Sequence, residues 1–539
     1  MATIQTTLGP VSGFVDTHVI SDKSTADQPK SNQKPVVKYL GLPYGEAGRW
    51  EQARPHMQWS ATKACLEYGP ATPQLPAVMG QRMAKVDGFL KRLHLGISEK
   101  DIYTLNIYTP DGAKEGDDLP VMVWLYGGSW KDGSASAMIY DATNVIRDAS
   151  QPVIIVTVNY RTNIFGFLAT EDLRDNDGLV GNYGLRDQLL GLKFVKDNIR
   201  KFGGDAGNVT IYGESAGAAS VVYHCVGRDA IFKRAIAQSG GTGTMSFLNI
   251  RDHEALWNLI LKSFGIVSED KAERVRRAKE IPMKHLLGFL HKMPGLIFSA
   301  CQEQGPNAIW TEHPAAKFDR GETVPSLESF MAGVCTDEGL IFAQLFGMHD
   351  DQSRIDSFVK KHGAAAAYYP HVYANIGDAK QHKGDLESHP ASRMIHNELF
   401  EGPVVFDIER LSKAGKVKCF LYRSNAILPS WREFGWGVHH ASELPLVFKT
   451  AGLWRNDANA EEARTAQDYV DKWVAFAARG EPANTQVWPQ YSASNRQRYV
   501  FEMGGSSASH LEEVDISPAM QLHEGVIKAV AGIQSGSKL

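Results

Sequence analysis

An α/β fold, built on a large, mostly parallel, doubly wound central sheet with helices on both faces, is the fold class that the sequence predicts. Short apolar runs rich in β-branched residues alternate along the 539 residues with longer stretches of helical periodicity. Hydrophobic residues make up 43% of the chain and charged residues 22%, so a large core can form. Because no internal repeat, low-complexity tract or Pro/Ser linker divides the sequence, residues 1–539 are expected to form one domain with insertions.

Apolar runs predict the strands. Three runs are expected to be buried on both faces of the sheet, and they cover residues 119–128, 152–160 and 208–215. Two later candidates are residues 328–339 and 417–425. Between the second and third runs, residues 182–204 have the periodicity of a helix that stops at a glycine pair. Its apolar face carries Leu185, Leu189, Leu192 and Val195. The strand–helix–strand order is typical of parallel strands joined by crossover helices.

Charge and cysteine usage limit the classes of function. The net charge of -4 argues against a nucleic-acid partner. The first twenty residues lack a charged segment followed by a long apolar run, and no stretch of about 18 apolar residues occurs, so neither secretion nor a membrane span is expected. Five widely separated cysteines without CxxC spacing are expected to be buried, reduced thiols: Cys65, Cys225, Cys301, Cys335 and Cys419.

The densest chemical motif follows the third strand. Residues 213–217, Gly-Glu-Ser-Ala-Gly, read G-x-S-x-G between an apolar strand and the small residues of a helix start. The two glycines allow a turn sharp enough to lift the Ser215 hydroxyl clear of the sheet, at the positive end of the helix. The bare pattern also occurs in ordinary turns, but the flanking strand and helix favour a nucleophilic serine.

A serine nucleophile needs a base within hydrogen-bond reach and an acid that holds this base. The segment WGVHHASELP offers His439 and His440, and because neighbouring side chains point in different directions, at most one of them can be the base. Asp337 and Glu338 are also adjacent, and either carboxylate can orient an imidazole. The residue pattern leaves both choices open. A metal site from His439, His440 and Glu443 fits the spacing, but no further ligand or motif accompanies it.

The reaction also needs donors for an oxyanion. Gly127 and Gly128 follow the first predicted strand, and such a pair lets backbone N–H groups face a ligand at close range. A glycine-rich tight turn is the alternative interpretation of the pair. Together with the G-x-S-x-G segment, the oxyanion interpretation is favoured.

Several longer stretches carry a resemblance to a known family. They are IYGESAGAAS, GNYGLRDQLLGLKFVKDNIRKFGGDAGNVT, NYRTNIFGFL, LNIYTP and WVAFAARGEPANTQVWPQY. Together they resemble the type-B carboxylesterase and cholinesterase-like family of α/β hydrolases, and the likeness runs from about Leu8 to about Tyr491. The resemblance implies the α/β-hydrolase fold with inserted loops and helices over the active site, and a reaction that requires no metal or organic cofactor.

The resemblance also implies roles for individual residues. The family's histidine is followed three positions later by an acidic residue, and only one histidine of the HHASE segment fits this rule. The implied nucleophile, acid and base are Ser215, Glu338 and His440. The implied oxyanion donors are the backbone N–H groups of Gly128, Ser129 and Ala216. Glu214 matches a glutamate that tunes the charge of the pocket, although a carboxylate at a helix N-terminus also has a structural explanation.

Two departures from the family pattern are informative. Many members have a third glycine where this chain has Ser129, whose side chain narrows the pocket or adds a hydroxyl donor. An early disulfide of secreted relatives is missing, because GPATPQ and SEKDIYTLN contain no cysteine. Residues 72–101 are therefore expected to form an untethered flap, which suits a reducing compartment. This flap contains no tryptophan, so choline-ester selectivity is not expected.

The function expected from these features is that of a serine carboxylic-ester hydrolase, which attacks a small-molecule ester through a Ser-Glu-His triad and an acyl-enzyme intermediate. A transacylase or an acyl-CoA thioesterase with the same triad is the alternative within enzymes. A non-catalytic binding module of the cholinesterase-like type is disfavoured, because all three triad positions are filled. The sequence indicates neither the ester nor the oligomeric state.

The C-terminal residues contain a candidate targeting signal. Residues 532–539 read as a flexible tail, and Ser537, Lys538 and Leu539 form the tripeptide that the peroxisomal import receptor binds at a free C-terminus. A peroxisomal location is therefore expected, with the cytoplasm as the alternative.

Overall fold

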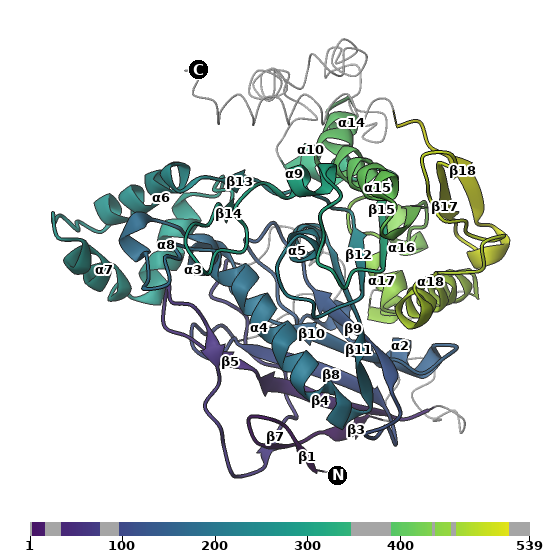
Figure 1. The fold of residues 1–539 in the computed structure, drawn as a ribbon, viewed down its shortest axis with the longest axis horizontal. Helices are drawn as coiled ribbons and strands as arrows, with labels where there is room; N and C mark the ends of the chain where they lie inside the picture. The colour runs from purple at the N-terminus through teal and green to yellow at the C-terminus, as the bar shows by residue number, and fades with distance from the viewer. Residues whose placement is uncertain are drawn as a thin grey trace.

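The computed structural model describes residues 3–16, 34–75, 96–345, 390–433, 437–453 and 460–516. Its centre is an eleven-stranded sheet (Figure 1) in the order β18-β17-β16-β15-β12-β11-β9-β10-β8-β4-β3. Along the chain these strands are β3 (Phe14–Asp16), β4 (Val36–Pro43), β8 (Thr104–Pro110), β9 (Leu119–Leu125), β10 (Ile154–Val158), β11 (Gly204–Glu214), β12 (Arg234–Gln238), β15 (Ser329–Cys335), β16 (Lys418–Ser424), β17 (Gln497–Phe501) and β18 (His510–Glu513).

The sheet is parallel throughout its middle. Strands β17, β16, β15, β12, β11, β9 and β10 pair in parallel, whereas the outer strands β18, β8, β4 and β3 pair antiparallel. The five predicted runs correspond to β9, β10, β11, β15 and β16, and their side chains are almost all buried. The prediction of a mostly parallel α/β sheet is confirmed.

The predicted helix between the second and third runs is present with one difference. Helix α4 (Tyr183–Asn198) continues as a 3₁₀ turn over Ile199–Phe202, and Gly203 ends it with a φ of 93°. This left-handed conformation favours glycine and stops the helix, as predicted. Strand β11 then begins at Gly204, four residues before the apolar run, because its first residues pair with β9 through an irregular register.

Helices cover both faces of the sheet (Figure 1). Helices α4 and α5 (Ala216–Cys225) lie over one face, and α2 (Thr143–Asp148) and α18 (Ala460–Arg479) lie over the other. This arrangement is the doubly wound architecture that the strand–helix alternation predicts. The shorter helices are α3 (Asn163–Phe167), α9 (Pro314–Asp319), α10 (Gly339–Leu345), α14 (Pro390–Ile395), α16 (Pro429–Glu433) and α17 (Leu444–Val447). Helix α15 (Gly402–Ala414) follows a π-helical turn at His396–Glu401.

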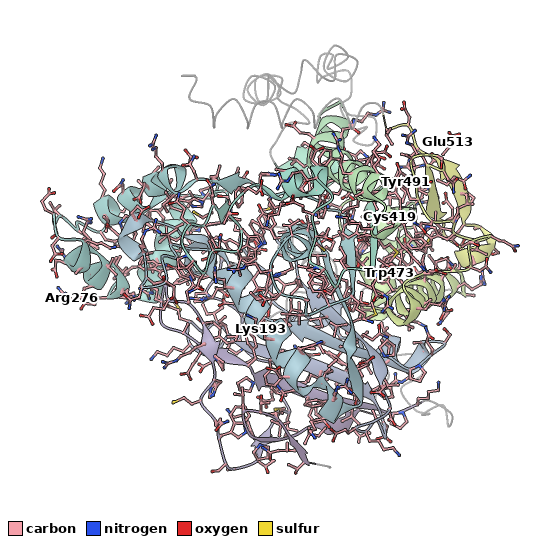
Figure 2. The ribbon with its side chains drawn as sticks, in the orientation of Figure 1. Lys193, Arg276, Cys419, Trp473, Tyr491 and Glu513 are labelled. Carbon is pink, nitrogen blue, oxygen red and sulfur yellow. The ribbon has the colours of Figure 1, made fainter. Side chains whose placement is uncertain are left out.

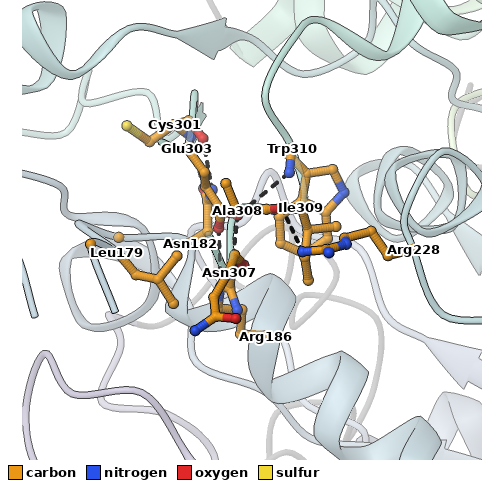
Figure 3. Close-up of polar contacts among 12 residues, drawn as sticks. Leu179, Asn182, Arg186, Arg228, Cys301, Glu303, Asn307, Ala308, Ile309 and Trp310 are labelled. Carbon is orange, nitrogen blue, oxygen red and sulfur yellow. Dashed lines mark hydrogen bonds and ion pairs between the residues drawn. The ribbon is translucent and has the colours of Figure 1, made fainter. Parts of the chain in front are cut away.

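A helical insertion between β12 and β15 forms a lobe at one side of the molecule (Figure 1). It consists of α6 (Ile250–Ser263), α7 (Lys271–Lys279) and α8 (Met283–Lys292). The chain that returns from this lobe is joined to the start of α4 by the buried carboxylate of Glu303 (Figure 3). This carboxylate accepts hydrogen bonds from Asn182 and Arg186 and from the backbone N–H of Ile309, at 2.7–3.1 Å.

Most buried apolar side chains of the described residues belong to one large cluster. Cys419, Trp473 and Tyr491 are at most 2% exposed, whereas Lys193, Arg276 and Glu513 lie on the surface (Figure 2). All five cysteines are buried and free, which confirms the expectation of buried thiols. None of the helices in the described ranges is long and apolar enough to cross a membrane. Two predicted segments lie outside the described residues, namely most of the flap (76–95) and the tail (532–539).

Candidate active site

The serine of the G-x-S-x-G motif lies where β11 passes into α5. Ser215 has φ 60° and ψ -124°, a strained conformation for a residue with a side chain, and its N–H donates to the carbonyl of Gln238 at 2.8 Å. The residue is 7% exposed, and its hydroxyl has no hydrogen-bond partner among the described residues. The predicted strand–turn–helix context is therefore present.

Close packing explains both glycines of the motif. A Cβ atom at Gly217 would lie 2.1 Å from the carbonyl oxygen of Leu125, and one at Gly213 would lie 2.6 Å from the same oxygen. Both distances are far below van der Waals contact. The turn can therefore approach the end of β9, where the proposed oxyanion segment begins, only if these positions carry no side chain.

Two buried residues from distant parts of the chain meet beside this turn. Glu338 follows β15, and its Oε2 lies 2.5 Å from Nδ1 of His440. Its Oε1 accepts the backbone N–H of Cys335 at 2.6 Å, which fixes the carboxylate. The rings of Phe342 and Phe400 pack against the imidazole, with centroids 5.1 Å and 4.5 Å away. The structure thus brings together the acid and the base that the family resemblance implies.

The neighbouring histidine has different surroundings. His439 is 1% exposed, stacks on Trp431 with ring centroids 5.3 Å apart, and places Nδ1 2.7 Å from the carbonyl oxygen of His440. Burial lowers the pKa of His439 to about 4, so the ring is neutral. Asp337 is only partly buried and pairs its backbone with this segment, donating its N–H to Val438. These contacts indicate packing rather than proton transfer for His439.

The second nitrogen of His440 faces a carboxylate. Nε2 lies 3.0 Å from Oε1 of Glu214, and no hydrogen bond joins it to Ser215. Burial disfavours the charged ring, but the carboxylates of Glu214 and Glu338 outweigh it and raise the pKa of His440 to about 10. In this arrangement the imidazole is protonated. Glu214 is therefore an ionic partner of the imidazole, beyond its place at a helix N-terminus.

The segment after β9 presents its backbone to the serine. A Cβ atom at Gly127 would lie 2.5 Å from the carbonyl oxygen of Glu214 and 3.0 Å from Cβ of Ser215, so the two segments are in direct contact. Gly128 and Ser129 both have positive φ, at 107° and 56°. Within the described part of the chain, no acceptor binds the N–H groups of Gly128, Ser129 or Ala216. The Ser129 side chain is exposed.

Comparison with known proteins shows the family of this chain. A model of the carboxylesterase family matches residues 3–516. The chain belongs to the carboxylesterase family. The para-nitrobenzyl esterase of Bacillus subtilis is 27% identical over 509 residues, which are 90% of this chain and 95% of the relative. The medium-chain fatty acyl-CoA hydrolase precursor of Anas platyrhynchos is 27% identical over 518 residues, with coverages of 92% and 89%.

Solved structures agree with this assignment. A carboxylesterase of Geobacillus stearothermophilus has a TM-score of 0.74 and 25% identity, and the match covers 96% of this chain and 99% of that chain. The family, the α/β-hydrolase fold and the class of enzyme, a carboxylesterase-type hydrolase, are therefore as the sequence predicts.

This carboxylesterase has a further buried acid, Glu443, which the sequence offers as a metal ligand and as the acidic residue three positions after His440. Glu443 accepts hydrogen bonds from Gln238 at 3.1 Å and from the Cys335 thiol at 3.0 Å. Burial, followed by the charge of Glu214, raises the pKa of Glu443 to about 7. Among the described residues, no group of three or more His, Cys, Asp or Glu side chains is arranged to hold a metal ion, and His439, His440 and Glu443 therefore form no such group. The signal in the sequence was the spacing of the HASE segment, which locates Glu443 but does not reveal its partners.

Proposed function

We propose that this carboxylesterase hydrolyses a small-molecule carboxylic ester through a Ser215–Glu338–His440 triad and an acyl-enzyme intermediate. The observation that carries the proposal is the 2.5 Å contact between Glu338 and Nδ1 of His440, beside a serine on a strained strand-to-helix turn. This arrangement of nucleophile, base and orienting acid is the one that acyl transfer requires. Membership of the family supports ester hydrolysis as the overall reaction.

In the first half-reaction the Ser215 hydroxyl attacks the ester carbonyl carbon and passes its proton to Nε2 of His440. For this step Nε2 turns from Glu214 toward the serine, while Glu338 keeps hold of Nδ1. Negative charge develops on the carbonyl oxygen, and the N–H groups of Gly128, Ser129 and Ala216 stabilise it. The bond to the leaving oxygen then breaks, and the imidazolium protonates the alcohol.

In the second half-reaction water attacks the acyl-enzyme carbonyl while His440 takes a proton from it. The tetrahedral intermediate collapses, the carboxylic acid leaves, and Ser215 recovers its proton from the imidazolium. The 3.0 Å approach of Glu214 to Nε2 supports a role in stabilising the imidazolium that forms in both halves of the reaction.

The nucleophile is tested with a fluorophosphonate probe, which phosphonylates an activated serine. Ser215→Ala is expected to abolish labelling and turnover without changing the thermal unfolding temperature, because the hydroxyl makes no hydrogen bond to the described residues. Ser494→Ala, on an exposed turn, serves as the matched control and is expected to label fully. Stoichiometric labelling of the Ser215 variant would overturn the assignment.

Cleavage of a thioester is a second candidate function. The chain matches the Anas platyrhynchos fatty acyl-CoA hydrolase precursor over 92% of its length, and a triad of this kind attacks thioesters and esters alike. Turnover of acyl-CoA and of p-nitrophenyl esters with equal acyl chains distinguishes the two reactions. Addition of an alcohol acceptor tests acyl transfer, because a transacylase forms a new ester in place of the free acid.

Import into peroxisomes through Ser537, Lys538 and Leu539 stays a prediction from the sequence, since these residues lie outside the described ranges. A fluorescent protein fused to the N-terminus is expected to give punctate fluorescence that coincides with a peroxisomal marker. Deletion of the three residues is expected to make the signal diffuse. A diffuse signal from the intact chain contradicts the prediction and favours the cytoplasm.

A further inference from the structure

The proposed oxyanion donors come from two separate parts of the chain. Gly128 and Ser129 follow β9, whereas Ala216 begins α5. Stabilisation of an oxyanion requires these N–H groups to converge on one point, so the two segments must be held at a fixed separation. Close contact at Gly127 sets how near they come, but it does not fix the direction of the N–H groups that follow. This inference rests on the proposed function.

The backbone next to these donors is strained. Ser129 and the following Trp130 both have left-handed φ angles, 56° and 50°, which residues with side chains rarely adopt. Such conformations persist only where the surrounding contacts determine them. The exposed Ser129 side chain cannot supply these contacts, and the buried Trp130 can.

The contacts of Trp130 are specific. Its ring is 0% exposed and stacks on Phe167, with centroids 4.6 Å apart and an interplanar angle of 11°. Its carbonyl oxygen accepts the N–H of Asn163 at 2.6 Å. Its indole Nε1–H donates to Oγ of Ser220, 90 residues away in α5, at 2.9 Å. The side chain therefore links the oxyanion segment to the helix that supplies the third donor.

Ser220 is the junction of this link. Its hydroxyl donates to the carbonyl oxygen of Ala216 at 2.9 Å and accepts from Nε2 of Gln188 at 3.1 Å as well as from Trp130. One donated and two accepted bonds use the full capacity of a hydroxyl group. Since Ala216 also supplies a proposed oxyanion donor, Ser220 connects Trp130 to the peptide units at the start of α5.

The far end of the network is fixed as well. Oε1 of Gln188 lies 2.9 Å from Nε2 of His224, and burial lowers the pKa of His224 to about 3. The neutral ring therefore donates from Nε2, because the amide oxygen can only accept. This orients the Gln188 amide so that its NH₂ group faces Ser220. A buried network with every member satisfied is rigid.

We propose that Trp130 is a positioning residue for the oxyanion hole: its indole N–H, through Ser220, holds the amides of Gly128 and Ser129 in register with the amide of Ala216. The role is geometric, and Trp130 does not touch the substrate. Loss of a single oxyanion donor lowers kcat about 10²–10³-fold. Loosening of the segment without removal of a donor is expected to lower kcat by about 10-fold to 100-fold.

The test separates the N–H group from the ring. Trp130→Phe keeps an aromatic ring against Phe167 and removes the indole donor, and Ser220→Ala removes the acceptor. For each variant we expect kcat to fall about 10-fold to 100-fold with KM nearly unchanged. A trifluoromethyl ketone, which forms a tetrahedral adduct with the serine, is expected to lose affinity by the same factor. The kcat of the double variant is expected to equal that of the single variant with the lower kcat, because both changes break the same link.

Controls distinguish positioning from loss of structure. Trp257→Phe removes another buried indole donor, which binds Asp172 away from the site, and it is expected to leave kcat and ketone affinity unchanged. The midpoint of the pH dependence of kcat/KM is expected to stay constant in Trp130→Phe, since the partners of His440 are intact. If Trp130→Phe does not fold, the test rests on Ser220→Ala. Ser220→Thr keeps a hydroxyl at this position and is expected to recover the kcat that Ser220→Ala loses.

Two outcomes overturn the inference. One is a folded Trp130→Phe or Ser220→Ala enzyme whose ketone affinity equals that of the wild type. The other is a double variant whose loss is the product of the two single losses, because this means that the residues act independently. Failure of the proposed function is a different result, namely fluorophosphonate labelling that survives Ser215→Ala.

Discussion

His440 lies between two carboxylates, and its Nε2 atom, the one that must take the serine proton, is 3.0 Å from Oε1 of Glu214 rather than bonded to Ser215. The imidazole is therefore held as an imidazolium in this arrangement, with a pKa raised to about 10. A base has to be neutral to accept a proton. Glu214 thus stabilises the product of proton transfer and, by the same charge, opposes the start of the next cycle.

Glu214→Gln is expected to shift the pH dependence of kcat/KM toward lower pH. The neutral form of His440 is the active form, so kcat/KM rises with pH through the pKa of this ring. Removal of the negative charge next to Nε2 lowers that pKa, and the rising limb is expected to shift by at least about one pH unit toward acid. The measurement is kcat/KM from pH 5 to pH 10. The exposed Glu328→Gln serves as the control, and a limb that does not move contradicts the ionic role of Glu214.

Substitution of the two adjacent histidines is expected to affect different properties: kcat for His440 and stability for His439. His440→Ala removes the base, and kcat is expected to fall by about three to six orders of magnitude. His439→Ala removes a buried ring that stacks on Trp431, so it is expected to lower stability by about 1–3 kcal/mol while kcat changes far less. Turnover and thermal unfolding of both variants distinguish the roles. A reversed order of the effects on kcat contradicts the assignment.

Two glycine substitutions are expected to change stability in opposite directions. Gly217→Ala places a Cβ atom 2.1 Å from the Leu125 carbonyl, and because neither backbone can yield cheaply, a loss of several kcal/mol is expected. Gly288 lies exposed within α8 and would place its Cβ atom in open space, so Gly288→Ala is expected to add about 0.5–1 kcal/mol. Thermal unfolding of both variants checks the pair, and a Gly217→Ala protein as stable as the wild type contradicts the packing argument.

Local pattern was enough to predict the central strands, the helix over residues 182–204 and the turn at Ser215. Each of these is set by a few successive residues: apolar strands buried on both faces, one apolar helical stripe, and glycines that close packing requires. The family resemblance added the choice of His440 over His439, which spacing alone left open because the partner, Glu338, is 102 residues away.

Other features of the site depend on contacts that no local pattern contains. The link from Trp130 to Ser220 spans 90 residues, and the direction of Nε2 toward Glu214 follows from side-chain packing. The π-helical turn at His396–Glu401 is equally hidden, since its backbone differs from an ordinary helix only in hydrogen-bond spacing. It carries Phe400, whose ring packs on His440.

Asp407 is expected to make the stability of the protein fall as pH rises. This buried residue of α15 accepts hydrogen bonds from the N–H and the hydroxyl of Thr242 at 2.8 Å and 2.7 Å. Burial nevertheless raises its pKa from the usual 3.8 to about 8, because the hydrogen bonds offset only part of the cost of burying the charge. Between these two values the folded protein holds a proton that the unfolded chain has released.

Stability linked to Asp407 is therefore fully present below about pH 4 and declines until about pH 8, where the folded protein ionises too. The Asp407→Asn side chain cannot ionise. The backbone N–H of Thr242 can still donate to the amide oxygen of the new side chain, and the Thr242 hydroxyl can rotate to accept a hydrogen bond from the amide NH₂ group. The difference in unfolding temperature between pH 5 and pH 8 is expected to shrink in this variant. The exposed Asp177→Asn is the control, since its carboxylate faces solvent. An equal decline in wild type and Asp407→Asn means that the carboxyl of Asp407 is already ionised at pH 5.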